Sequence, residues 1–440
     1  MPEPRQITTA PHGHVLTNSG VWSPDSRWIV YDVRSTPDGS VFDGTRIERV
    51  EVDTGRVEVV YESREGACCG VVTHSPVDDR LAFILGPERP TPAWSYGAAR
   101  RQGVVVRTSR PGVVENLDAR DMMPPFTAGA LRGGTHLHVF SPDGAAVSST
   151  YEDAVLEAAA DAGQGGERSL RGVGVSACGR PTTVPTTHPR NHDGSAFTVL
   201  VSRLTDAPSP GSDEISKAFE EAWIGEAGYA NADGVRQRRA IAFQGYVVTT
   251  MGETISEVFV VDLPDELAAL ATAGEGPVAG TATTRPAPPR GVRQRRLTRT
   301  ADRRYPGIQG PRHWLRSSPD GTRIALLMRD DAGIVQLFTV NPAGGVPRQV
   351  THDAVGIASA FSWSPDSERL ACVIDGSVCL IDAGSGDVTR LTAAAARDDM
   401  GPRPEACVIS PDGRRIAYAR RVVAVDGRTW NQIFVVDVPQ

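Results

Sequence analysis

Histidine is the residue type whose spacing in this chain most clearly suggests chemistry. The sequence has nine histidines, and several stand at fixed offsets before a recurring turn, Ser-Pro-Asp-Gly or a variant of it. His138 and His188 come three residues before such a turn, His136 and His313 come five residues before one, and Glu405 shares the second offset. Alternate residues of a strand point to the same face. These side chains would therefore share a face if the segments before the turns are equivalent strands.

Imidazoles and a carboxylate that converge from different repeats suit a divalent transition metal. We therefore expect these four histidines and Glu405 to hold one ion, of manganese, iron, zinc or nickel. Two other interpretations stay open: metal-free histidines that relay protons or bind a ligand, and a water-filled channel lining. His12 and His14 precede the first repeat and could reach the same place.

Arginines accompany the histidines, and guanidinium groups bind carboxylates and phosphates through paired hydrogen bonds. They point to a small, polar, anionic substrate, with aromatic side chains available to stack on a ring. The residues expected to contact it are Arg100, Arg101, Arg312, Arg403, Trp94 and Tyr96. The candidates for the catalytic base are Arg132, Arg190 and His192.

Composition bounds the class of protein. The chain has 440 residues, of which 40% are hydrophobic and 22% charged, so it can bury a large core. A net charge of -7 disfavours a nucleic-acid binder. Lys217 is the one lysine, which removes most lysine chemistry. We expect no membrane span, because no apolar run is long enough, and a cytoplasmic location, because no apolar segment follows the N-terminus.

A repeat positions the candidate residues. Clean copies of the turn begin at Ser23, Ser141, Ser318, Ser364 and Ser410, and degenerate copies begin at Ser75 and Asn191. Each copy is flanked by short apolar segments, and about 46 residues separate the last three, which is the length of a four-stranded propeller blade. Seven copies predict an all-β, seven-bladed β-propeller of antiparallel blades, formed as one domain over residues 1–440. The long interval 193–318 leaves six or eight blades open.

The ends and the long loops complete the expected architecture. The chain ends on a third-strand pattern, so an N-terminal strand at residues 5–8 should close the last blade. Insertions at 86–101, 115–134, 204–238 and 299–312 should open on the top face, where a scaffold presents a site. We expect an amphipathic helix over Gly211–Tyr229 as a lid, and a disordered loop over 267–292.

Two stretches carry a family resemblance: Gly133–Gly144, which contains His136-Leu137-His138, and Thr187–Ser195. The chain resembles an uncharacterised bacterial family of Tol-type, WD40-like propellers along nearly its whole length. More remotely, it is similar to oligogalacturonate lyases, seven-bladed propellers that hold a manganese-type ion through three histidines and a glutamine. That likeness would place the histidine pair on His136 and His138, further histidines on His188 or His313, and the glutamine on Gln309 or Gln336.

Two functions follow as hypotheses. The first is a metal-dependent lyase or isomerase (epimerase) that acts on a small carboxylated, sugar-like substrate at the top of the channel. The alternative is a non-catalytic, TolB-like propeller that binds a protein or a small ligand, since propellers serve both uses. The substrate, the metal and the oligomeric state are not specified by the sequence.

Overall fold

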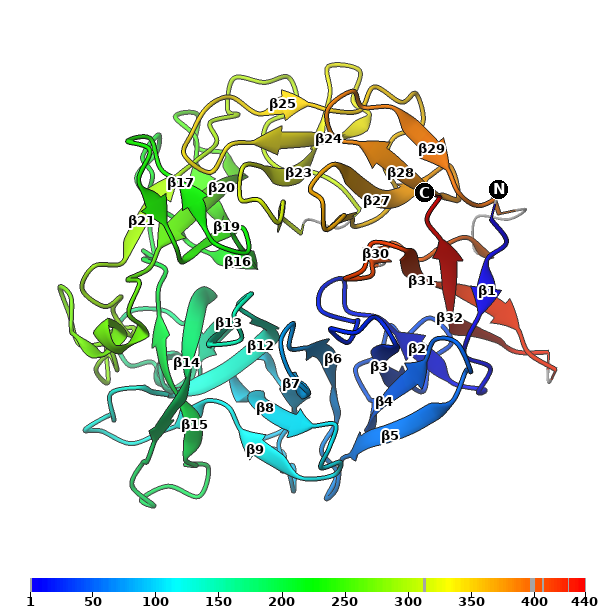
Figure 1. The fold of residues 1–440 in the computed structure, drawn as a ribbon. Helices are drawn as coiled ribbons and strands as arrows, with labels where there is room; N and C mark the ends of the chain where they lie inside the picture. The colour runs from blue at the N-terminus through cyan, green and yellow to red at the C-terminus, as the bar shows by residue number, and fades with distance from the viewer. Residues whose placement is uncertain (1, 312–313, 396–399, 406, 426, 440) are drawn as a thin grey trace.

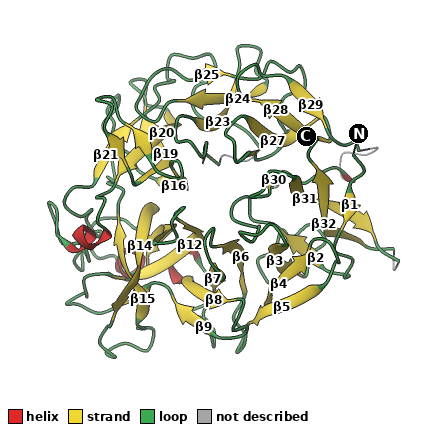
Figure 2. Ribbon diagram, viewed as in Figure 1, coloured by secondary structure: helices red, strands yellow, loops and turns green. Residues whose placement is uncertain are grey.

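The strands of the chain form a ring of seven antiparallel sheets. The computed structural model describes residues 2–311, 314–395, 400–405, 407–425 and 427–439. Within these ranges, seven sheets have four strands each, and Figure 1 shows them arranged around a central opening. Figure 2 shows that strands and loops make up nearly all of the ring. The predicted seven-bladed propeller is therefore confirmed.

Each blade contributes one strand at each of four positions, counted from the channel outward. The first strands are Gly13–Val15 (β2), Cys69–His74 (β6), Gly133–Phe140 (β12), Ala218–Trp223 (β16), Arg316–Ser317 (β22), Ser362–Trp363 (β26) and Val408–Ile409 (β30). The second strands are Trp28–Arg34 (β3), Arg80–Leu85 (β7), Ala146–Asp153 (β13), Ala240–Val248 (β19), Ile324–Arg329 (β23), Arg369–Ile374 (β27) and Arg415–Val423 (β31).

The outer positions follow the same order. The third strands are Arg46–Glu51 (β4), Gln102–Arg107 (β8), Gly172–Thr182 (β14), Thr254–Asp262 (β20), Val335–Val340 (β24), Ser377–Asp382 (β28) and Thr429–Asp437 (β32). The fourth strands are Val57–Glu62 (β5), Val114–Asn116 (β9), Gly194–Leu200 (β15), Arg293–Arg296 (β21), Arg348–Gln349 (β25), Val388–Arg390 (β29) and Arg5–Gln6 (β1).

The remaining elements are short. They are the parallel pair Ala119–Arg120 (β10) and Ala130–Leu131 (β11), the hairpin Tyr229–Ala230 (β17) and Arg236–Gln237 (β18), the helix Ala154–Asp161 (α1), and two 3-10 turns, Ala98–Arg100 (η1) and Leu267–Ala271 (η2).

The repeated turn folds as its residues dictate. In the copy at Ser141, the hydroxyl donates to Asp143 (2.6 Å) and accepts from the backbone N–H of Ala146 (2.9 Å), while Gly144 adopts a φ of +68°. Apolar strands on both sides then pack between the blades as the core. β1 pairs with β32, so the predicted closure of the last blade by the N-terminal strand is confirmed.

The predicted helix over Gly211–Tyr229 is wrong. Residues 218–223 instead form β16, in which the side chains of Ala218, Phe219 and Ala222 are buried. The one α-helix of the described residues is α1, in the loop between β13 and β14. Its N-terminus is capped by Asp153, whose carboxylate accepts the N–H groups of Val155 and Leu156.

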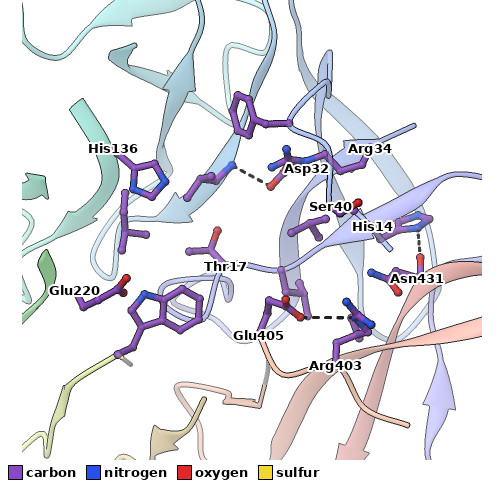
Figure 3. Close-up of a pocket in the computed structure, with 18 of the residues that line it drawn as sticks. His14, Thr17, Asp32, Arg34, Ser40, His136, Glu220, Arg403, Glu405 and Asn431 are labelled. Atoms are coloured by element: carbon purple, nitrogen blue, oxygen red, sulfur yellow. Dashed lines mark hydrogen bonds and ion pairs between the residues drawn. The ribbon is translucent and has the colours of Figure 1, made fainter. Parts of the chain in front are cut away.

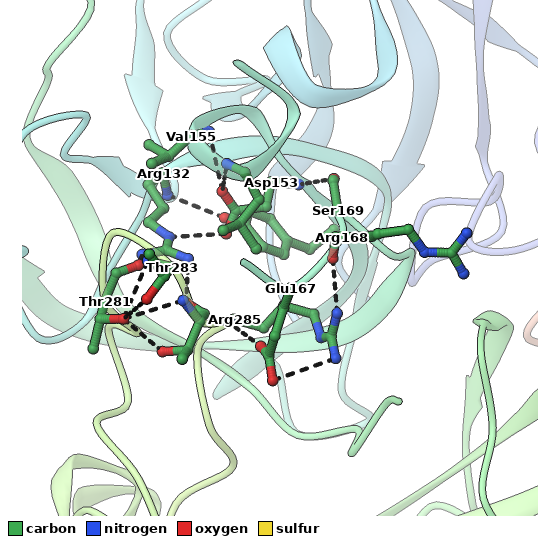
Figure 4. Close-up of polar contacts among 12 residues, drawn as sticks. Arg132, Asp153, Val155, Glu167, Arg168, Ser169, Thr281, Thr283 and Arg285 are labelled. Carbon is green, nitrogen blue, oxygen red and sulfur yellow. Dashed lines mark hydrogen bonds and ion pairs between the residues drawn. The ribbon is translucent and has the colours of Figure 1, made fainter. Parts of the chain in front are cut away.

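The loop over 267–292, expected to be disordered, has defined contacts. The Arg132 side chain donates to the backbone oxygens of Thr281 and Thr284. Arg285 lies 3.6 Å from Glu167 (Figure 4). It also binds Asp206 at 2.5 Å. Ionic and backbone contacts therefore anchor this segment, together with Leu270 and Val278, which are buried in the core between neighbouring blades.

The turn copy at Asn191 does not lie between the first and second strands of a blade, where the repeat predicts it. It leads into β15, the fourth strand of the third blade, rather than joining a first strand to a second. In the fourth blade the first and second strands are instead separated by the inserted hairpin β17–β18. The interval 193–318 therefore contains one blade with insertions, and the number of blades remains seven.

Candidate functional site

A cavity of about 530 Å³ lies where the first strands of several blades meet (Figure 3). Residues of β2, β6, β12 and β16 line it, together with the segments that lead into β22 and β30. The loop between β3 and β4 supplies Asp38, Gly39, Ser40 and Phe42. Loops between second and third strands and between blades open on the same face of a propeller, so this channel pocket lies at the top.

Three first strands share an irregularity inside the channel pocket. Val71, Leu137 and Glu220 have φ values of +57°, +56° and +56°, each at a shift in the pairing of its strand. All three line the channel pocket. A non-glycine residue in this region is strained, and such bulges redirect side chains beside functional sites.

The bulge at Leu137 separates the two histidines that were expected to act together. His136 lines the channel pocket, and burial lowers its pKa well below the usual value. His138 instead lies buried between blades, with Nε2 2.9 Å from the Thr135 hydroxyl. Burial, and then Arg101, lower the pKa of His138 to about 3. The expectation of a shared face is wrong because the bulge breaks the alternation of side chains.

The other expected metal ligands are also dispersed. His188 lies in the connection between β14 and β15, on the outer side of its blade, where Nδ1 accepts the N–H of Arg190 at 3.1 Å. Glu405 does line the channel pocket, 3.8 Å from Arg403. Figure 3 shows it apart from His136. Arg312 and His313 lie outside the described residues, and the described members of the set do not fit a single ion.

The expected bases and most of the expected substrate contacts lie elsewhere. Arg132 is buried against Asp153 at 2.8 Å, both side chains being 1% exposed. His192 is half-buried behind β10, where its backbone bridges to that of Arg120. Trp94 is flanked by the guanidinium groups of Arg100, Arg120 and Arg190, at 5.6, 5.8 and 5.6 Å from its ring.

Arg101 and Tyr96 form a similar pair, with the guanidinium 6.0 Å from the ring. These arginines and aromatic rings contact one another as a cation–π cluster and do not line the channel pocket. Among the described residues, Arg403 is the one expected substrate contact that lines the channel pocket.

Several lining residues were not anticipated. Asp32 and Arg34 form a buried ion pair of 2.6 Å at the end of β3. Asp32 also accepts the N–H of Val71 at 3.0 Å, which supports the bulge there. The backbone of Gly70 makes this approach possible, because a Cβ at that position would lie 2.6 Å from the Asp32 carboxylate. The sequence signal that could have indicated these residues is a pair of opposite charges, Asp32 and Arg34, two residues apart in an otherwise apolar strand.

Glu221 is the most unusual of these residues. It is 1% exposed, and both carboxylate oxygens are without a hydrogen-bond partner among the described residues. Burial raises its pKa to about 8, and the neighbouring Glu220 adds to the rise, while Arg316 and Arg171 oppose it. A carboxyl group with such a pKa can exchange a proton near neutral pH.

The charges of the lining are unequal. Among the described residues the channel pocket has five carboxylates and three guanidinium groups, the latter on Arg34, Arg171 and Arg403. Each arginine has a protein partner: Asp32 for Arg34, Glu152 for Arg171 at 2.6 Å, and Glu405 for Arg403. Protein carboxylates therefore already hold these arginines in place on the wall.

A second group of titratable side chains adjoins this wall. His12, His14 and Glu48 each offer one donor atom within 4.8 Å of the others. His14 also lines the channel pocket. Burial, and then His12, lower the pKa of His14 to about 4, so its ring is neutral at physiological pH. Of the described histidines, this pair fits a metal ion better than those named by their turn offsets.

A family model and one curated protein match the sequence of this chain. A family model described as a protein of unknown function, DUF3748, matches residues 68–192. The uncharacterized protein YidR of Escherichia coli (strain K12) is 48% identical over 415 residues, which cover 94% of each chain. No helix in the described ranges is long and apolar enough to cross a membrane.

Two solved structures align with this chain at low sequence identity. An oligogalacturonate lyase in complex with manganese aligns over 100% of this chain and 99% of its own, with a TM-score of 0.51 and 11% identity. TolB from Acinetobacter baumannii aligns over 94% of this chain and 80% of its own, with a TM-score of 0.38 and 13% identity. At these identities, the likeness to the lyase extends to the fold alone.

Proposed function

The chain belongs to the family of Escherichia coli YidR, and we propose that its channel pocket binds a small carboxylated, sugar-like molecule and moves a proton at the carbon beside that carboxylate, as a lyase or an epimerase does. The observation that carries the proposal is Glu221, a buried carboxyl group on the pocket wall with no hydrogen-bond partner among the described residues.

The arginines supply the recognition. Arg34 ends β3, Arg171 precedes β14, and Arg403 precedes β30, so three different blades hold a guanidinium group on the wall. Arg403 Nε has no hydrogen-bond partner in the described chain. A substrate carboxylate would bind these donors in bidentate fashion, and a planar fork would orient the adjoining carbon toward a base.

Glu221 supplies the base. The ionised carboxylate takes the proton from the substrate carbon, and the bonding electrons move into the substrate carboxylate to give an enolate. The guanidinium groups stabilise the charge that develops. A proton delivered from water to the opposite face of the enolate gives the epimer, and Glu221 then releases its proton to solvent. Expulsion of an oxygen substituent from the next carbon, with its bonding electrons, gives an unsaturated acid.

The sequence predicts metal dependence, whereas the proposed proton transfer uses side chains that line the channel pocket. The manganese belongs to the lyase structure, and the ligands expected by their turn offsets do not gather around one point in the described chain. Proton transfer is therefore assigned to the groups that line the channel pocket.

The test compares the wild type with Glu221→Gln on a panel of uronates and related hydroxy acids. We expect wild-type protein in deuterium oxide to exchange the proton next to the carboxylate or to form an unsaturated product, and E221Q to be slower by at least a hundredfold. Glu253→Gln, at an exposed carboxylate that does not line the channel pocket, is the matched control. Equal rates for E221Q and wild type would remove Glu221 as the base.

The pairing of every wall arginine with a protein carboxylate favours a second candidate, a non-catalytic binding propeller. In such a site, protein carboxylates already balance the charge of the three arginines without a substrate. This candidate predicts saturable binding of an acid by calorimetry with no exchange of its carbon-bound proton. Affinity would then depend on Arg403 and be insensitive to E221Q.

A further inference from the structure

The N-terminal segment carries a histidine pair that is held against the first blade. His12 directly precedes β2, and His14 lies within it. The two side chains are two residues apart and share a face, and their rings stack with centroids 4.5 Å apart. Gly13, between the two histidines, lets the backbone of this segment lie close to that of Thr36, because a Cβ on Gly13 would be 2.4 Å from the Thr36 backbone oxygen.

The orientation of His14 is that of a metal ligand. Its Nδ1 lies 2.9 Å from the backbone oxygen of Asn431 on β32, which accepts the Nδ1 proton and leaves the lone pair on Nε2 (Figure 3). The side chain is fully buried, and Nε2 has no hydrogen-bond partner among the described residues. A buried polar atom in that state costs about 1–3 kcal/mol unless something binds it.

His12 and Glu48 complete the donor set. The Nε2 atom of His12 also lacks a hydrogen-bond partner in the described chain, and it lies 3.7 Å from Oε2 of Glu48. Glu48 stands on β4, is 3% exposed, and accepts the hydroxyl of buried Tyr31 at 2.9 Å. Arg46 lies on the other side of the carboxylate, 3.5 Å from Oε1.

We propose that His12, His14 and Glu48 bind one divalent transition metal ion. Two imidazoles and one carboxylate, with coordination positions left open, are the ligand set of many zinc and iron(II) sites. Ligands about 2.1 Å from a common ion lie roughly 3.4 Å apart in a tetrahedral arrangement. Donor atoms within 4.8 Å of one another therefore need to move by about 1 Å to close on the ion.

The surrounding contacts support this assignment. The Asn431 carbonyl and the Tyr31 hydroxyl orient two of the three ligands, which is how partners of ligands act in metal sites. The ion would also tie the N-terminal segment to β4 beside the seam where β32 closes the ring. The inference concerns binding alone and does not depend on the reaction proposed for the channel pocket.

The experiment measures metal stoichiometry in the full chain purified without a histidine tag. The protein is stripped with a chelator, loaded separately with zinc, iron(II) under anaerobic conditions, and manganese, and then desalted and analysed by elemental mass spectrometry. We expect close to one equivalent of zinc or iron in the wild type. We also expect His14→Gln and Glu48→Gln to retain at least tenfold less of that metal after desalting.

The matched control is His136→Gln, which removes the pocket histidine and should leave the stoichiometry unchanged. Cobalt(II) added to the wild type gives a readout that does not require a folded variant, because ligation by two imidazoles and a carboxylate produces visible absorption bands. No bound metal and no cobalt bands in the wild type would overturn the proposal. So would a metal that is retained in H14Q and E48Q and lost in H136Q.

Discussion

At the scale of single residues, Glu221 should make the stability of the protein depend on pH in a recognisable way. Burial raises its pKa to about 8 from a usual 4.5, so the folded state keeps the proton that the unfolded chain releases. The stabilisation from the buried neutral acid is complete below pH 4.5 and is lost as pH rises toward 8. Glutamine mimics the protonated form at every pH.

We therefore expect the melting temperature of Glu221→Gln, relative to wild type, to rise between about pH 4.5 and pH 8 and to stay constant above that. Scanning fluorimetry across this range measures it, with Glu253→Gln as the exposed control. In turnover assays, kcat/KM should increase with an apparent pKa near 8 if Glu221 is the base. A melting difference that does not change with pH would mean that this carboxyl group is ionised throughout.

At the scale of elements, the bulges in the first strands decide which side chains reach the channel pocket. Val71 holds a φ of +57°, which is costly for a β-branched residue. In Val71→Gly, relief of strain should offset the lost side chain, leaving stability within about 1 kcal/mol of wild type. The adjacent Val72 is fully buried, so Val72→Gly should cost more than about 2 kcal/mol.

Urea unfolding of the two valine variants provides the comparison. Equal losses would show that the bulge at Val71 stores no strain.

The same bulges explain why the histidine offsets misled the sequence prediction. Alternation places His136 and His138 on one face only in a regular strand, and the single residue Leu137 at φ +56° turns His138 between blades.

Other elements were predictable to different degrees. The Ser-Pro-Asp-Gly turns were predictable from the sequence, because their hydrogen bonds join residues no more than five positions apart. The strand β16 was not predictable from the sequence, because the acidic residues around Ser212 resemble a helix start, whereas burial of Ala218 and Phe219 is a long-range effect. The convergence of Arg34, Arg171 and Arg403 on one pocket also depends on blade packing, which offsets in the sequence do not encode.

The clamp between Arg132 and the loop over 267–292 gives a further prediction at this scale. Removing the guanidinium in Arg132→Ala leaves the Asp153 carboxylate buried without its charge partner, which should destabilise the protein by about 3–5 kcal/mol. Proteolysis should also begin within the released loop. The control is Arg203→Ala, which loses only an exposed pair with Glu275 on the same loop and should cost less than about 1 kcal/mol.

Chemical denaturation and limited proteolysis together check the role of Arg132. A protein of unchanged stability that has lost activity would return Arg132 to the catalytic role expected from the sequence. Loss of stability with intact activity per folded molecule would establish that its contacts are structural.

At the scale of the whole molecule, the ring is closed by a strand of only two paired residues. Arg5 and Gln6 pair with Val435 and Phe434 of β32, and the Thr8 hydroxyl adds bonds to Gln432 (2.8 Å) and to the N–H of Ile433 (2.9 Å). Deleting residues 2–9 would leave β32 as an open, apolar edge, and exposed edges pair with other chains.

We expect that deletion to lower the melting temperature and to cause association that increases with protein concentration. The reason is that β1 links the N-terminal end of the chain to β32 in the seventh blade, and without β1 this link is lost. Size-exclusion chromatography at several concentrations and thermal melting measure the effect. Thr8→Val, which removes the hydroxyl contacts and keeps the strand, should lie between the deletion and wild type. A deletion variant that elutes and melts like the full chain would show that the six internally complete blades, with the remaining three strands of the seventh, hold the ring closed without β1.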